Sequence, residues 1–227
     1  MAIDLHTHYL PEPVADMMRA RTSAPFISAG DGGETFHMPN GTLAINAAYH
    51  DMDARLEFMD GIGVRAQMLS LAGLFGADSL PAEEALPFCR AFNDHVSELA
   101  GRNKSRFAGL ASLPFADMDA AVAEYERGRN ELGLIGAILP NNFFLTLDWA
   151  EKIRPVMDAA NRLGGHIFIH PGPRPDQRAD LAPGHTPSVR DNAFARAALD
   201  VQSMVGHAMV TLLFTDYLDA YPDLSLH

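Results

Sequence analysis

Short apolar runs that alternate with longer stretches of helical spacing constrain the fold of this 227-residue chain more than any other feature. Six runs rich in Val, Ile, Leu and Phe are typical of buried strands, at residues 2–6, 64–71, 107–113, 135–140, 166–170 and 224–227. Helical periodicity covers residues 53–61, 83–101, 117–133, 148–164 and 191–221, the last predicted as two helices or one broken helix. This alternation predicts an α/β fold with a parallel sheet.

The predicted helices carry their own end signals. Asp117 and Asp148 can accept hydrogen bonds from the first backbone N–H groups of two of them. Gly133 and Gly164 suit the left-handed conformation that ends many helices. Between the first strand and the first of these helices, residues 22–50 are rich in Gly and Pro, which predicts an insertion of loops or a hairpin after the first strand.

Composition narrows the class of protein. With 48% hydrophobic and 20% charged residues, the chain is predicted to form one α/β domain over residues 1–227, incomplete as a barrel. A formal net charge of -12 disfavours nucleic acid and anionic membranes as partners. The single cysteine, Cys89, is predicted to be a buried apolar residue and favours a reducing compartment. Because we find no signal-peptide pattern or membrane-spanning run either, we expect a cytoplasmic protein.

Histidines fall where a barrel would gather them. His6, His170 and His227 end three predicted strands, and His8 lies just beyond the first. A closed barrel brings such strand ends to one mouth, whereas an open sheet spreads them apart. No Gly-x-Gly-x-x-Gly motif follows the first strand, which removes the usual support for a dinucleotide-binding sheet.

The spacing of His6 and His8 allows both imidazoles to face one metal ion, since alternate residues of an extended segment point the same way. His170 precedes a Pro-Gly turn and should face the mouth. His166, four residues earlier, is expected at the opposite end of the barrel in a packing role. Five other histidines are assigned no site role: His37, His50, His95, His185 and His207. Arg174 and Arg178, soon after His170, are placed to make forked contacts with a substrate carboxylate.

Five stretches together resemble the amidohydrolase superfamily, within it the branch that contains aminocarboxymuconate-semialdehyde decarboxylase. They are IDLHTHYLP at 3–11, RLEFMD at 55–60 with the following Gly63-Val64, FAGLASLP at 107–114, HPG at 170–172 and YPDL at 221–224 with His227. The resemblance runs from one end of the chain to the other.

This resemblance implies a distorted (β/α)8 TIM-barrel-like fold with about six of its eight strands in this chain. It also implies one divalent metal ion, usually zinc with manganese possible, held by His6, His8 and His170. His227 would act beside the metal as acid and base. A last metal-binding aspartate belongs at the end of the eighth strand, and the sequence ends at the sixth, so we expect a truncated barrel.

The leading functional hypothesis is a metal-dependent decarboxylase of a small unsaturated or aromatic carboxylic acid. Metal-dependent hydrolysis of a lactone, ester or C–C bond is the first alternative, because the same site serves both reactions. A non-catalytic metal-binding or assembly module is an alternative of another class. An open barrel also leaves strand edges exposed, so we expect a homo-oligomer.

Overall fold

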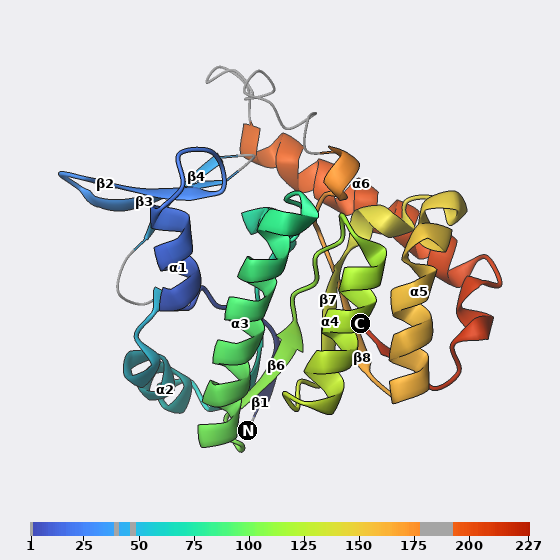
Figure 1. The fold of residues 1–227 in the computed structure, drawn as a ribbon, viewed down its shortest axis with the longest axis horizontal. Coiled ribbons are helices and arrows are strands. Elements are labelled where there is room, and N and C mark those ends of the chain that lie inside the picture. Colours follow the sequence, from blue (N-terminus) through green and yellow to red (C-terminus); the bar gives the residue numbers. More distant parts are fainter. Residues whose placement is uncertain (1, 39–40, 46–48, 178–192) are drawn as a thin grey trace.

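A computed structural model describes residues 2–38, 41–45, 49–177 and 193–227 (Figure 1). Six parallel strands form the main sheet in the order β1-β5-β6-β7-β8-β9. Their bounds are β1 Ala2–His8, β5 Val64–Ser70, β6 Phe107–Ala111, β7 Gly136–Pro140, β8 His166–His170 and β9 Ser225–Leu226. All six predicted strands are therefore present, and the alternation of strands and helices is confirmed.

The sheet curls into part of a barrel. Four strand spacings separate β1 from β8, which would place the two strands about 19 Å apart in a flat sheet. Instead, the rings of His6 on β1 and Phe168 on β8 have centroids only 5.0 Å apart. One apolar side chain from each of four neighbouring strands fills the concave face, namely Met68, Leu110, Ile138 and Phe168. Such an inner layer is typical of a TIM-type barrel, so the predicted fold class is confirmed.

Helices cover the convex face of the sheet. They are α2 Met52–Gly61, α3 Ala82–Arg102, α4 Met118–Asn130, α5 Leu147–Leu163 and α6 Ala193–Leu213. Figure 1 shows α3, α4 and α5 standing side by side along the sheet. The last predicted helical stretch is indeed broken, because η5 (Tyr217–Ala220) follows α6. Cys89 lies on α3 and is completely buried, as predicted.

The helix ends confirm some sequence signals and correct others. Asp117 accepts from Ala120 N and caps α4 as predicted. The cap of α5 was predicted wrongly, because Thr146 accepts from Trp149 N while Asp148 lies within the first turn. Gly164 adopts the left-handed conformation that ends α5. Helix α1 (Glu12–Arg19) was not predicted; it begins after Pro11 and packs against α3.

The stretch predicted as loops or a hairpin contains a three-stranded antiparallel sheet, β2 Phe26–Gly30, β3 Gly33–Met38 and β4 Gly41–Ile45. In Figure 1 this sheet stands out from the main body above α1. Phe36 of β3 is fully buried against Phe75 of η2 (Gly73–Phe75), and Phe75 in turn lies near the His8 ring. The small sheet therefore packs beside the histidines of the mouth. None of the described helices is both long and apolar enough to span a membrane.

Candidate metal centre

Three histidine side chains converge inside the curled sheet. His6 and His8 come from β1, and His170 is the last residue of β8. The Nε2 atom of His6 lies 3.1 Å from Nε2 of His8 and 3.2 Å from Nε2 of His170. Among the residues that the structure describes, these three form the group able to hold a metal ion. The structure thus brings together all three predicted ligands.

The spacing of the three nitrogens fits one divalent ion. Zinc–imidazole bonds of about 2.0–2.1 Å at tetrahedral angles place two ligand nitrogens about 3.3 Å apart. Bonds of that length at the right angles of an octahedron place them about 2.9 Å apart. The two separations that involve His6, 3.1 and 3.2 Å, lie between these values, and all three ligand atoms lie within 4.8 Å of one another. The three imidazoles are therefore compatible with either geometry and do not select zinc over manganese.

Burial keeps two of the three imidazoles neutral, which is the form that binds metal. Desolvation, followed by the neighbouring imidazoles of His170 and His6, lowers the pKa of His8 to about 3. Desolvation is also the main cause that lowers the pKa of His170 to about 4. Both rings therefore retain a free nitrogen lone pair at neutral pH.

Hydrogen bonds at the far nitrogens orient the same two rings. His170 Nδ1 donates to the carbonyl oxygen of Pro171 at 2.9 Å. His8 Nδ1 lies 3.4 Å from Ser70 Oγ, whose own hydroxyl donates to Thr7 O at 3.2 Å. Both contacts leave Nε2 available for the ion. Ser70 is fully buried at the end of β5, and our sequence analysis missed it, although its place at a strand end was a signal.

A bulge next to His6 shapes the β1 side of the group. Asp4 pairs with Gln67 and Thr7 with Leu69, so three steps along β1 match two along β5. The Asp4 carboxylate accepts from His6 N at 3.1 Å and from Gln67 Nε2 at 3.2 Å. Arg55 of α2 donates to Gln67 Oε1 and to His8 O. The sequence pattern gave no indication of this network.

His227 is not one of the three converging histidines, but burial and then the nearby imidazole of His6 lower its pKa. Its backbone bonds to Ile167 O and Ile169 N, so it sits beside Phe168, two residues short of His170. The His227 ring stacks on Phe168 with centroids 4.3 Å apart, and Phe168 also contacts His6. Nδ1 of His227 lies 2.7 Å from Nε2 of His166. The acid and base role of His227 therefore stays a prediction.

Of the two arginines predicted to bind a carboxylate, Arg174 lies among the described residues. Arg178 lies outside the described residues. Arg174 is buried, its Nε and Nη2 make a forked contact with the two carboxylate oxygens of Asp176 at 3.0 Å, and Nη1 donates to Asn142 O. Its guanidinium also stacks on Trp149, 3.6 Å from the ring centroid. The contact predicted for a substrate is thus made within the chain.

Among the described residues, the histidines to which we gave no site role either contact a neighbouring residue or are exposed to solvent. His37 stacks on Phe26, and His95 bonds to Tyr9 OH. His50 Nδ1 faces Leu10 O, and His207 is exposed on α6. His185 lies outside the described residues.

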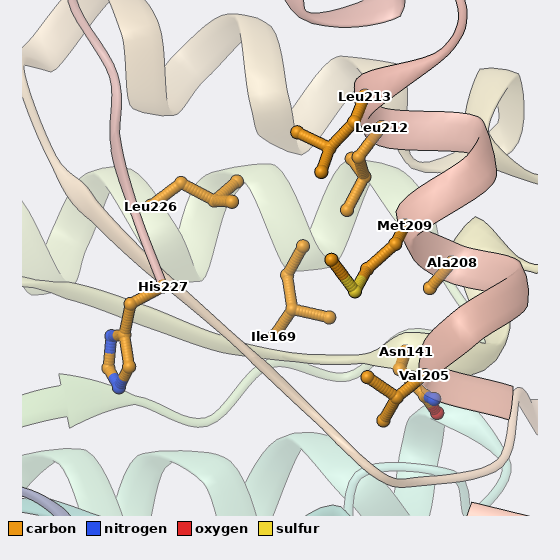
Figure 2. Close-up of a pocket in the computed structure, with 9 residues that line it drawn as sticks. All are labelled: Asn141, Ile169, Val205, Ala208, Met209, Leu212, Leu213, Leu226 and His227. Atoms are coloured by element: carbon orange, nitrogen blue, oxygen red, sulfur yellow. The ribbon is translucent and has the colours of Figure 1, made fainter. Parts of the chain in front are cut away.

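An apolar pocket of ≈ 200 Å³ lies between α6 and the strands β8 and β9 (Figure 2). Figure 2 shows Ile169 and Met209 pointing toward one another across it, whereas the His227 ring points away from α6. Ile169 and His170 are neighbours in a strand and face opposite sides of the sheet. The pocket is therefore separate from the three histidines, and its apolar walls do not suit a carboxylate.

The amidohydrolase family profile matches residues 3–226. The chain belongs to this amidohydrolase family. It is 29% identical over 177 residues to 2-amino-3-carboxymuconate-6-semialdehyde decarboxylase of Dictyostelium discoideum, covering 75% of this chain and 49% of that protein. It is 30% identical over 188 residues to gamma-resorcylate decarboxylase of Rhizobium radiobacter, covering 77% and 53%. The chain thus spans about half the length of the curated relatives it matches.

Solved structures agree on the fold. The chain is similar to 5-carboxyvanillate decarboxylase from Sphingomonas paucimobilis, with a TM-score of 0.67, 22% identity, and coverage of 99% of this chain and 65% of that one. It is also similar to a dihydroxybenzoic acid decarboxylase from Polaromonas sp. JS666 with bound manganese, with a TM-score of 0.61, 20% identity, and coverage of 99% and 63%.

Proposed function

We propose that this chain carries the metal-binding part of a metal-dependent decarboxylase that acts on an aromatic or unsaturated carboxylic acid. The single observation behind the proposal is the convergence of His6, His8 and His170 within an amidohydrolase half-barrel. The named relatives support decarboxylation over the alternatives, because the two curated ones are decarboxylases.

A divalent ion bound here would act as a Lewis acid toward an oxygen atom of the substrate. Either zinc or manganese fits the spacing of the nitrogens, and we propose zinc as the resident ion with manganese as its substitute. The three histidines hold the ion, while Pro171 O and Ser70 hold two of the rings in place. Phe168 lies against His6 and His170 and closes the space below them with an apolar wall.

Decarboxylation breaks the bond between the carboxyl carbon and the carbon that bears it, releases carbon dioxide and requires a proton for that carbon. The resemblance assigns this proton transfer to His227. His227→Gln tests the role, because a glutamine can keep a hydrogen bond to His166 but cannot donate a proton as an imidazolium does. Loss of carbon dioxide release with retained metal would support the assignment, and unchanged release would remove it.

Carboxylate binding by Arg174 requires it to exchange Asp176 for the substrate. Asp176→Asn removes the competing charge while keeping a side chain of the same shape. A lower KM for a carboxylate substrate in this variant would support a substrate role for Arg174. An unchanged KM would indicate that Arg174 serves only to hold the turn after β8.

The activity test uses protein loaded with Zn²⁺ or Mn²⁺ and incubated separately with 2,6-dihydroxybenzoate and 5-carboxyvanillate. Carbon dioxide release equal to the acid consumed, absent from His170→Ala and retained in His207→Ala, is the expected result. His207 is a matched control because it is an exposed histidine on α6. Metal-loaded protein that releases no carbon dioxide from either acid would overturn the proposal. Ester or lactone hydrolysis by that protein would favour the hydrolase alternative.

We also propose that the chain self-associates. The edge strand β1 exposes Ile3 by 61% and Leu5 by 48%, and an open edge with apolar side chains tends to pair with another chain. Light scattering after gel filtration should give the mass of a discrete oligomer. A monomer at all concentrations would contradict this part of the proposal.

A further inference from the structure

The turn that follows His170 contains a peptide group that is held at both ends. The carbonyl oxygen of Pro171 accepts from His170 Nδ1 at 2.9 Å. The N–H of the same peptide group belongs to Gly172 and donates to Asn141 Oδ1 at 3.3 Å. Because a peptide group is planar, fixing the direction of its N–H also fixes the direction of its C=O.

Asn141 is well placed for this contact. It is the first residue of η3 (Asn141–Phe144), directly after Pro140, and Pro140 pairs in register with His170. Asn141 is 1% exposed and His170 is 4% exposed. A Cβ atom on Gly172 would lie 3.5 Å from Gly73 Cα and from Pro140 Cβ, so the turn is packed from two sides. The contact is therefore formed in a dry and crowded environment, where a bond orients its partners strongly.

Only the oxygen of the Asn141 side-chain amide makes a hydrogen bond within the described residues. Among the residues that the structure describes, Asn141 Nδ2 has no hydrogen-bond partner. In Figure 2 the side chain lies near Val205, at the end of an otherwise apolar pocket. A buried donor without a partner is destabilising. The bond from Gly172 N to Oδ1 is thus the contact through which the side chain acts.

We infer that Asn141 is a positioning residue for His170. Through the Pro171–Gly172 peptide it aims a carbonyl at Nδ1, which keeps the proton on Nδ1 and leaves Nε2 for a metal ion. The relevance of this arrangement to catalysis rests on the proposed function. The arrangement itself needs no metal, so it can be measured in the metal-free protein.

Two substitutions separate this role from simple packing. Asn141→Leu keeps the size of the side chain and removes the acceptor, so we expect little loss of thermal stability but a mixture of the two neutral tautomers at His170. Asn141→Asp keeps an acceptor for Gly172 N and buries a charge, so we expect lower stability with the Nδ1–H tautomer retained. The ¹⁵N chemical shifts of the His170 ring, measured by NMR at pH 8 in the presence of chelator, report the tautomer.

Asn161→Ala is the matched control, because Asn161 Oδ1 also accepts from a backbone N–H, that of Asp223 at 2.9 Å, and this bond does not involve the turn after His170. This control should leave the His170 shifts unchanged. A single Nδ1–H tautomer in Asn141→Leu would overturn the inference, as would a tautomer mixture in Asn141→Asp as large as in Asn141→Leu.

Zinc binding gives a second readout. Competition with a chelator should show an apparent Zn²⁺ affinity roughly 10- to 100-fold lower in Asn141→Leu than in the wild type or Asn161→Ala. Equal affinities in all three would contradict the positioning role. If no variant binds zinc while the tautomer changes as expected, the inference stands and the proposed metal function fails.

Discussion

His170 and His6 are placed to hold the same ion, but the chain fixes them by different means. His170 is 4% exposed, and its ring is tied to a backbone carbonyl of the next residue. His6 is exposed on the edge strand, and its ring nitrogen contacts only His8 and His170 among the described residues. At His170 the ring itself is held without a metal ion, whereas at His6 only the backbone is fixed, through Asp4.

Substitution of each ligand should show this difference most strongly. Both His170→Ala and His6→Ala should lose the metal. In the presence of a chelator, the free energy of unfolding of His170→Ala should be lower than that of the wild type by about 1–3 kcal/mol. The reason is that the substitution leaves a cavity and leaves Pro171 O without its hydrogen-bond donor. His6→Ala should stay within about 0.5 kcal/mol of the wild type, as exposed sites do. Urea denaturation measures both, and equal losses would remove the distinction between His170 and His6.

Metal binding should stabilise the folded chain, because the ion would join strand β1 to strand β8. At a free metal concentration of 100 times Kd, the expected gain is about 2.7 kcal/mol. For a chain of this size that corresponds to a rise in Tm of roughly 5–11 °C. Thermal unfolding with and without Zn²⁺ measures it, with His207→Ala as the control that should respond like the wild type. A zinc-dependent rise that persists in His170→Ala would show that the ion binds elsewhere.

Asp4 provides the next test, because it fixes the backbone at His6. Asp4→Ala should lower metal affinity about tenfold, at the lower end of what supporting residues contribute. Asp4→Asn keeps an acceptor for His6 N, so its metal affinity should fall by less than that of Asp4→Ala. If Asp4→Asn loses as much affinity as Asp4→Ala, the contact with Gln67 matters more than the bond to His6 N.

Ser70→Ala should give the smallest effect. The contact from His8 Nδ1 to Ser70 Oγ is long, at 3.4 Å, so we expect a loss of metal affinity of about tenfold or less. Ser97→Ala is the control, since it removes a hydroxyl bond to Leu132 O far from the histidines. If Ser70→Ala loses more metal affinity than Asp4→Ala, metal binding at β1 depends more on the contact to the His8 ring than on the backbone at His6.

The strands were predictable because each is a short apolar run with a turn signal after it. The convergence of the three histidines was predictable for a related reason: His6 and His8 share one strand, and His170 ends another. Local periodicity says nothing about bonds between distant residues, so Ser70, Gln67 and Asn141 were missed. Helix α1 was missed because it is only 8 residues long and carries Pro13 in its first turn. The extent of the three-stranded sheet was missed because Gly and Pro are frequent in residues 22–50.

His227 shows what the position of a strand end leaves open. The apolar run before it indicated a strand end, and strand ends meet at the mouth of a barrel. The register of β8 and β9 pairs Ile167 with Leu226, which leaves His227 level with Phe168 and below His170. Register depends on the packing of both strands, and one sequence does not reveal it.

Metal content is the most direct measurement of the central claim that His6, His8 and His170 hold one ion. Elemental analysis of purified wild-type protein, His170→Ala and His207→Ala would decide it. We predict about one zinc or manganese ion per chain in the wild type and in His207→Ala, and none in His170→Ala. No metal in the wild type after incubation with Zn²⁺ and Mn²⁺, or equal metal in all three proteins, would contradict the account.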